Sequence, residues 1–92
     1  MAHQDTKFEV SRGPSKLDLM FALFDTSKGV RTVKFRIANG FYDVEIVSIE
    51  RIDPLATTWN LQGTTRINDE KKRVSILYQS STRKGAMEIE NV

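Results

Sequence analysis

The chain contains no cysteine and a single histidine, and these two shortages remove much familiar catalytic chemistry. Without cysteine there is no disulfide, no thiolate nucleophile and no zinc–thiolate site. The histidine, His3, lies among the first residues, so a Ser-His-Asp or Cys-His arrangement has no suitable general base. A metal site would need oxygen ligands alone, and the spacing of a calcium-binding EF-hand loop does not occur. The sequence therefore predicts a protein that is not an enzyme, with no catalytic residue, metal ligand or cofactor.

Long apolar runs and clustered glycines are also missing. The longest apolar run, residues 19–24, has six residues, far fewer than the roughly 20 that span a bilayer. The first seven residues, MAHQDTK, contain no apolar stretch of the kind found in a secretory signal. The five glycines are scattered along the chain, so no glycine-rich phosphate-binding loop is present. We expect a cytoplasmic protein with no membrane insertion.

Length and charge indicate one small folded domain. The 92 residues include 14 basic and 12 acidic side chains, and the net charge of +2 is only a weak indication of nucleic-acid binding. Residues 1–7 predict a flexible N-terminal tail, and residues 8–92 predict a single β domain.

The clearest structural signal is Asn39-Gly40, which separates two runs of alternating apolar and polar residues. This dipeptide is typical of a two-residue type I′ turn, because both central residues of that turn take positive φ. The turn also sets the pairing of the two strands. The predicted pairs are Phe35–Val44 and Val33–Ile46 on the buried face, and Arg36–Asp43 and Lys34–Glu45 on the other face.

Alternation predicts several more short strands. We expect one at residues 8–10, two at residues 57–67 and 73–80 joined by a polar turn at 69–72, and a last one at residues 86–92. No internal repeat and no alternation of strands with helices is visible. The predicted fold class is all-β, an antiparallel meander of six to seven short strands that forms a small barrel or a sandwich.

Residues 16–25, KLDLMFALFD, fit both a strand and a helix. As a strand they alternate, and a three-residue loop at 27–29 would pair them with residues 33–37 in the register that Asn39-Gly40 sets, so we favour the strand. As a helix they would begin at Ser15 as N-cap, with Asp18 three residues later, and would pack on one face of an α+β fold. The apolar stripe of that helix would consist of Leu17, Met20, Phe21 and Phe24.

The order of the predicted hairpins brings several basic residues to one end of the predicted sheet, close to the aromatic residues Phe41 and Tyr42. Such residues can neutralise phosphates and stack a base, which suits nucleic acid. Asp43, Asp69 and Glu70 at the same end favour the alternative that these charges keep the protein soluble. The predicted contacts with nucleic acid are Arg12, Lys16, Phe41, Lys71, Lys72 and Arg73.

An apolar half-face is the second candidate surface. The predicted register puts apolar side chains outward beside the loop at 27–29, where polar residues are expected if the face meets water. A β-bulge near Val47 would turn part of this face inward, another segment such as residues 8–10 would cover it, or a second chain would bind it. The predicted interface residues are Phe24, Val30, Val47 and Ile49.

These patterns lead us to expect a non-enzymatic small β module that acts through protein–protein contacts, as a subunit or accessory protein, or by self-association. The alternative is a nucleic-acid-binding small β-barrel that uses a basic rim, and a β-barrel enzyme or small-ligand carrier comes third. Salt dependence of binding separates the first two, since phosphate contacts weaken steeply as salt rises.

Overall fold

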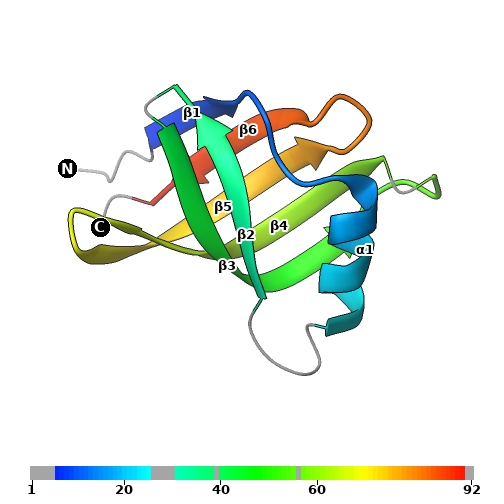
Figure 1. Ribbon diagram of the computed structural model, residues 1–92, viewed down its shortest axis with the longest axis horizontal. Coiled ribbons are helices and arrows are strands. Elements are labelled where there is room, and N and C mark those ends of the chain that lie inside the picture. The colour runs from blue at the N-terminus through cyan, green and yellow to red at the C-terminus, as the bar shows by residue number, and fades with distance from the viewer. Residues whose placement is uncertain (1–5, 26–30, 39, 56, 91–92) are drawn as a thin grey trace.

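A computed structural model describes residues 6–25, 31–38, 40–55 and 57–90, which form six antiparallel strands and one short helix (Figure 1). The elements are β1 (Thr6–Val10), α1 (Lys16–Asp25), β2 (Arg31–Ile37), β3 (Gly40–Arg51), β4 (Thr58–Ile67), β5 (Glu70–Gln79) and β6 (Lys84–Ile89). Residues 6 and 7, assigned above to the tail, belong to β1, and residues 1–5 lie outside the described part of the chain.

The strands form one sheet in the order β1-β6-β5-β4-β3-β2 (Figure 1). The sheet curls until its two edges meet beyond the end of β1. There the Ser11 amide donates to the Arg36 carbonyl at 2.9 Å, and the Arg36 amide donates to the Arg12 carbonyl at 2.7 Å. The predicted all-β meander is confirmed, and its curled form is a partly closed barrel rather than a sandwich.

β2 and β3 form the predicted hairpin, but their register differs from the prediction by two residues. Arg36 pairs with Phe41, and the last pair before the turn is Ile37–Gly40; Asn39 lies outside the described residues. Because side chains alternate with a period of two, this shift leaves every side chain on its predicted face. It does change which outward side chains are neighbours.

β4 and β5 are joined by a two-residue turn at Asn68-Asp69, so the predicted four-residue turn at 69–72 is wrong. Asn68 has φ 51° and Asp69 has φ 65°, as both central residues of a type I′ turn require. Asn and Asp enter this left-handed region more readily than most other side chains. Ile67 consequently pairs with Glu70, and β5 begins at residue 70 rather than 73.

Residues 16–25 form the helix α1, so the predicted strand there is wrong and the helical alternative is correct. The Asp18 amide donates to Ser15 Oγ at 3.2 Å, and the Ser15 amide donates to Asp18 Oδ2 at 3.3 Å, which is a capping box. The segment has no β-branched residue and is rich in the helix formers leucine, methionine and alanine. The edge of β2 that a strand would need is occupied by Ser11 and Arg12.

The core lies inside the curled sheet and beneath α1. Its largest side chains, Trp59 and Tyr78, are fully buried. Trp59 Nε1 donates to Ser80 Oγ at 3.2 Å, and Tyr78 Oη donates to the Pro14 carbonyl at 2.6 Å. Tyr78 also meets Phe35 edge-on, with ring centroids 5.6 Å apart. The predicted inward faces of β4, β5 and β6 are confirmed by the buried residues Trp59, Leu61, Val74, Ile76, Tyr78, Met87 and Ile89.

Candidate binding surfaces

The outward side of α1 carries exposed apolar side chains. Leu19 and Ala22 face the core and are buried, whereas Leu17 is 64% exposed and Phe21 is 50% exposed. Leu17 and Phe21 are four residues apart, so they lie on the same side of the helix. Both belong to the stripe that the helical alternative predicted, but here they face solvent. Phe24 lies further along the same helix, and its side chain is outside the described part of the structure.

A hydrogen-bonded loop between β3 and β4 places another apolar residue beside the start of α1. Lys16 Nζ donates to the Leu55 carbonyl at 3.0 Å, and the Leu55 side chain is 73% exposed. Asp53 accepts the Thr57 and Thr58 amides at 2.8 and 2.7 Å. Its hydrogen bond with the Thr57 hydroxyl is the main reason that the pKa of Asp53 lies below the usual 3.8. We call Leu17, Phe21 and Leu55 the α1 apolar surface.

The predicted apolar half-face is divided by a β-bulge. The β3–β4 register shifts at Val47, which is exposed, whereas Ile49 is partly buried against the core. The bulge that the sequence suggested near Val47 is therefore present, and it turns Ile49 inward. Phe24 lies on α1 rather than on a neighbouring strand, and Val30 lies outside the described residues. The described members of this set do not share one face.

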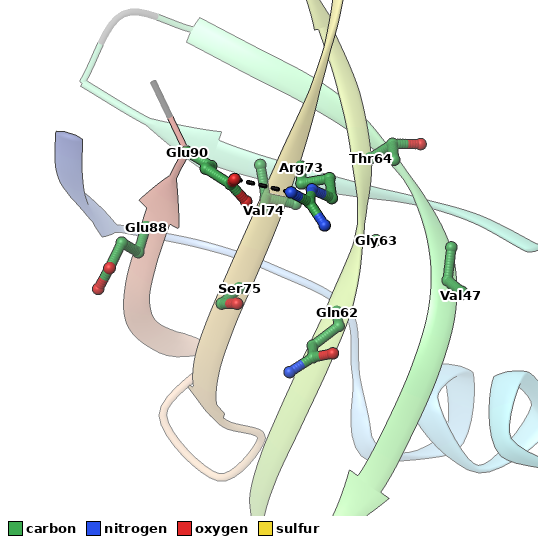
Figure 2. A pocket seen from close by; sticks show the side chains of 9 residues that line it. All are labelled: Val47, Gln62, Gly63, Thr64, Arg73, Val74, Ser75, Glu88 and Glu90. Carbon is green, nitrogen blue, oxygen red and sulfur yellow. Dashed lines mark hydrogen bonds and ion pairs between the residues drawn. The ribbon is translucent and has the colours of Figure 1, made fainter. Parts of the chain in front are cut away.

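A shallow hollow of about 330 Å³ opens beside Val47 on the outer face of β3 to β6 (Figure 2). Arg73 Nη2 lies 2.8 Å from Glu90 Oε1 across it. Glu88 points away from that pair in Figure 2 and forms an ion pair with Lys7 at 3.9 Å. Both carboxylates of this hollow thus neutralise a cation, an arrangement of strand-surface ion pairs rather than of a free acid and base.

Most of the predicted nucleic-acid contacts are already engaged within the fold. Lys16 holds the Leu55 carbonyl, as described above. The three basic residues of β5 each have a carboxylate partner, so the predicted basic rim is not continuous. The pairs are Lys71–Glu45 at 3.8 Å, Lys72–Glu70 at 3.3 Å and Arg73–Glu90 at 2.8 Å.

The remaining two, Arg12 and Phe41, lie with Lys34 and Arg36, which the sequence did not single out. The Phe41 side chain is 61% exposed. The Arg36 guanidinium carbon lies 5.5 Å from the Phe41 ring centroid and Lys34 Nζ lies 5.8 Å from it, both within the range of cation–π contacts. We call these four residues the Phe41 surface. The Phe41 surface could not be predicted from the sequence, because the predicted register paired Lys34 and Arg36 with acidic residues of β3.

No group of three or more His, Cys, Asp or Glu side chains in the described part of the chain could hold a metal ion. Within the same ranges, no helix is long and apolar enough to cross a membrane. Comparison of the chain with protein-family models, with curated proteins and with solved structures finds no match.

Proposed function

We propose that the protein is a non-enzymatic cytoplasmic β module that binds another protein chain through the α1 apolar surface. The observation that carries this proposal is the exposure of Leu17 and Phe21 on a helix whose opposite side is already buried. Single exposed apolar residues are normal on any protein surface. Two on one side of a helix, together with an exposed Leu55 on a loop hydrogen-bonded to the start of that helix, are the kind of exposed apolar surface that marks an interaction site.

The patch is held in place before any partner arrives. The capping box fixes the start of α1, and Lys16 and Asp53 fix the neighbouring loop. Preorganised side chains lose little conformational entropy on binding. Full burial of a leucine or phenylalanine side chain contributes about 1.5–3 kcal/mol. A second copy of this chain is the simplest partner, because one self-complementary patch would serve both subunits.

The double variant Leu17→Glu/Phe21→Glu is expected to abolish association and to leave the fold intact, since both side chains are exposed. Loss of two buried apolar contacts weakens binding by about 100-fold or more. Size-exclusion chromatography with light scattering over a range of concentrations measures self-association, and circular dichroism checks the fold. The matched control is Leu77→Glu, because Leu77 is 55% exposed on β5 rather than on α1; it should associate like the wild type.

If the wild type is monomeric at every concentration, the partner is a different protein. The wild type, the double variant and the control would then be used side by side to capture proteins from the cells of origin, and each captured protein would be purified and titrated. The proposal fails if the wild type stays monomeric and no captured protein binds the wild type and the control more tightly than the double variant.

A further inference from the structure

We propose that the Phe41 surface is a binding site for single-stranded nucleic acid, separate from the α1 apolar surface. A base stacks on the exposed Phe41 ring, and the phosphates on either side of that base contact Arg12, Lys34 and Arg36. This site goes beyond the protein contact proposed above and does not depend on it.

Backbone pairing brings these four side chains together. The β2–β3 ladder sets Arg36 directly opposite Phe41 on the outward face, and Lys34 lies two residues earlier on the same face. The backbone bridge between Arg12 and Arg36 adds a third basic residue where the barrel closes. The cluster is thus part of the folded framework, which favours a defined binding geometry.

The charges of the Phe41 surface are not balanced as those of β5 are. None of the ion pairs between described residues includes Arg12, Lys34 or Arg36. Asp43 is the cross-strand neighbour of Lys34, but the two form no ion pair. Such cations can contact a phosphate without first giving up a carboxylate partner.

A hollow of about 380 Å³ separates Phe41 from the segment that leads into α1. Arg12 and Lys34 line it together with Pro14, so it presents cations beside apolar surface. Asp18 also lines it, and its carboxylate accepts a backbone amide in the capping box. The volume falls within the range of about 300–1,000 Å³ that small-ligand sites occupy, which is enough for a base.

Phe41 distinguishes nucleic acid from other anionic partners. An acidic peptide needs only the cations, whereas stacking on an aromatic ring strengthens nucleic-acid binding by roughly 5- to 150-fold per base. A second hollow of about 410 Å³ lies on the β4 side of the ring and is lined by both Arg66 and Asp43, so a strand has room on both sides of Phe41. We expect a single strand rather than a duplex, because the bases of a duplex are already stacked on one another.

Binding of the full chain to fluorescein-labelled oligothymidylate of about 15 nucleotides would be measured by fluorescence anisotropy at several salt concentrations. Three phosphate contacts predict a slope of about −2 in a plot of log K against log salt. Phe41→Ala should weaken binding by roughly 5- to 150-fold and keep the slope. Lys34→Ala/Arg36→Ala should reduce the slope to less than half its wild-type size.

The matched control is Arg51→Ala/Lys84→Ala, which removes the same charge from exposed side chains at the opposite end of the strands. It should bind like the wild type apart from a small uniform loss. All variants change exposed side chains, and circular dichroism would verify that each is folded.

Four results would overturn single-stranded nucleic acid as the ligand, and a fifth would overturn the position of the site. The four are the absence of salt-sensitive binding at low salt, an unchanged affinity of Phe41→Ala, equal affinity for a duplex of the same length, and equal competition by polyglutamate. The last would assign the surface to acidic peptides. A greater loss from Lys71→Ala/Arg73→Ala than from Lys34→Ala/Arg36→Ala would instead move the contact to β5 and overturn the position of the site.

Discussion

Replacing Gly63 with alanine is expected to lower the free energy of unfolding by about 3 kcal/mol or more. Gly63 lies opposite Ile46, immediately beside the bulge at Val47. A Cβ atom at Gly63 would overlap the carbonyl oxygen of Glu45 and would lie 3.1 Å from Val44 Cγ1. The oxygen belongs to the β3 backbone, so it cannot move aside without disturbing the β3–β4 ladder. Urea unfolding followed by the fluorescence of the single tryptophan would measure the loss.

Gly40→Ala is the matched control, because it adds the same methyl group at a position where no neighbouring strand is close. Gly40 has φ 127°, and nothing lies within 4 Å of the position that a Cβ would occupy. Alanine there meets backbone strain of about 1–3 kcal/mol but no overlap with a neighbouring strand. A Gly63→Ala protein as stable as the wild type, or one that loses no more than Gly40→Ala, would contradict the close approach of β3 to β4 at Gly63.

Between pH 10 and 12 the wild type is expected to lose about 2–3 kcal/mol of stability through Tyr78. The side chain is fully buried, and its hydroxyl donates to the Pro14 carbonyl. Burial is the main cause that raises the pKa of Tyr78 from 10.0 to about 12, although Arg83 and Arg12 act in the opposite direction. The unfolded chain loses this proton near pH 10, and the folded chain keeps it until about pH 12. The stabilisation is therefore complete below pH 10 and is lost as pH rises to 12.

Tyr78→Phe separates this effect from other titrations at high pH. At neutral pH it should be less stable than the wild type by about 1–2 kcal/mol, because the Pro14 carbonyl loses its donor. The stability difference should shrink as pH rises from 10 to 12, since only the wild type carries the titrating hydroxyl. Urea unfolding at a series of pH values would show this, and parallel curves for the two proteins would contradict a buried, protonated Tyr78.

Strand faces could be predicted from this sequence, whereas strand registers could not. The face of a side chain follows the period of two except at a bulge, so the sequence predicts the faces of Phe35, Val44 and the inward residues of β4 to β6 correctly. The bulge at Val47 is the exception, because it turns Ile49 from its predicted outward face toward the core. Register depends on the turn, and the sequence predicts a polar turn at 69–72 instead of the observed turn at Asn68-Asp69, which lacks the glycine that marks a type I′ turn most clearly. The predicted β2–β3 and β4–β5 registers each differ from the observed ones by an even number of residues, and an even shift leaves each side chain on the same face of the sheet. The core was therefore predictable, and the neighbours on the outer surface were not.

The candidate sites depend on those unpredicted neighbours. Arg36 stands beside Phe41 only in the observed register. The strand prediction for residues 16–25 is wrong because two agreeing strand registers outweigh the capping box of Ser15 and Asp18 in the sequence, whereas the capping box is what the structure contains. Its outward stripe was visible as a pattern, but a pattern cannot show which of two apolar sides of a helix faces the core. That choice follows from tertiary packing of Leu19 and Ala22.

The pairing of β1 with β6 has a consequence for synthesis on the ribosome. β2 to β6 pair with strands that are next to them in the chain, so each can add to a growing sheet as it emerges. β1 is made first, yet its partner is the last strand, and Thr6 pairs with Ile89. Because the ribosome adds about 5–20 residues per second, several seconds pass between the synthesis of β1 and that of β6. Until β6 is available, the edge strands of the nascent sheet stay unpaired, and unpaired strand edges are prone to pair with other chains.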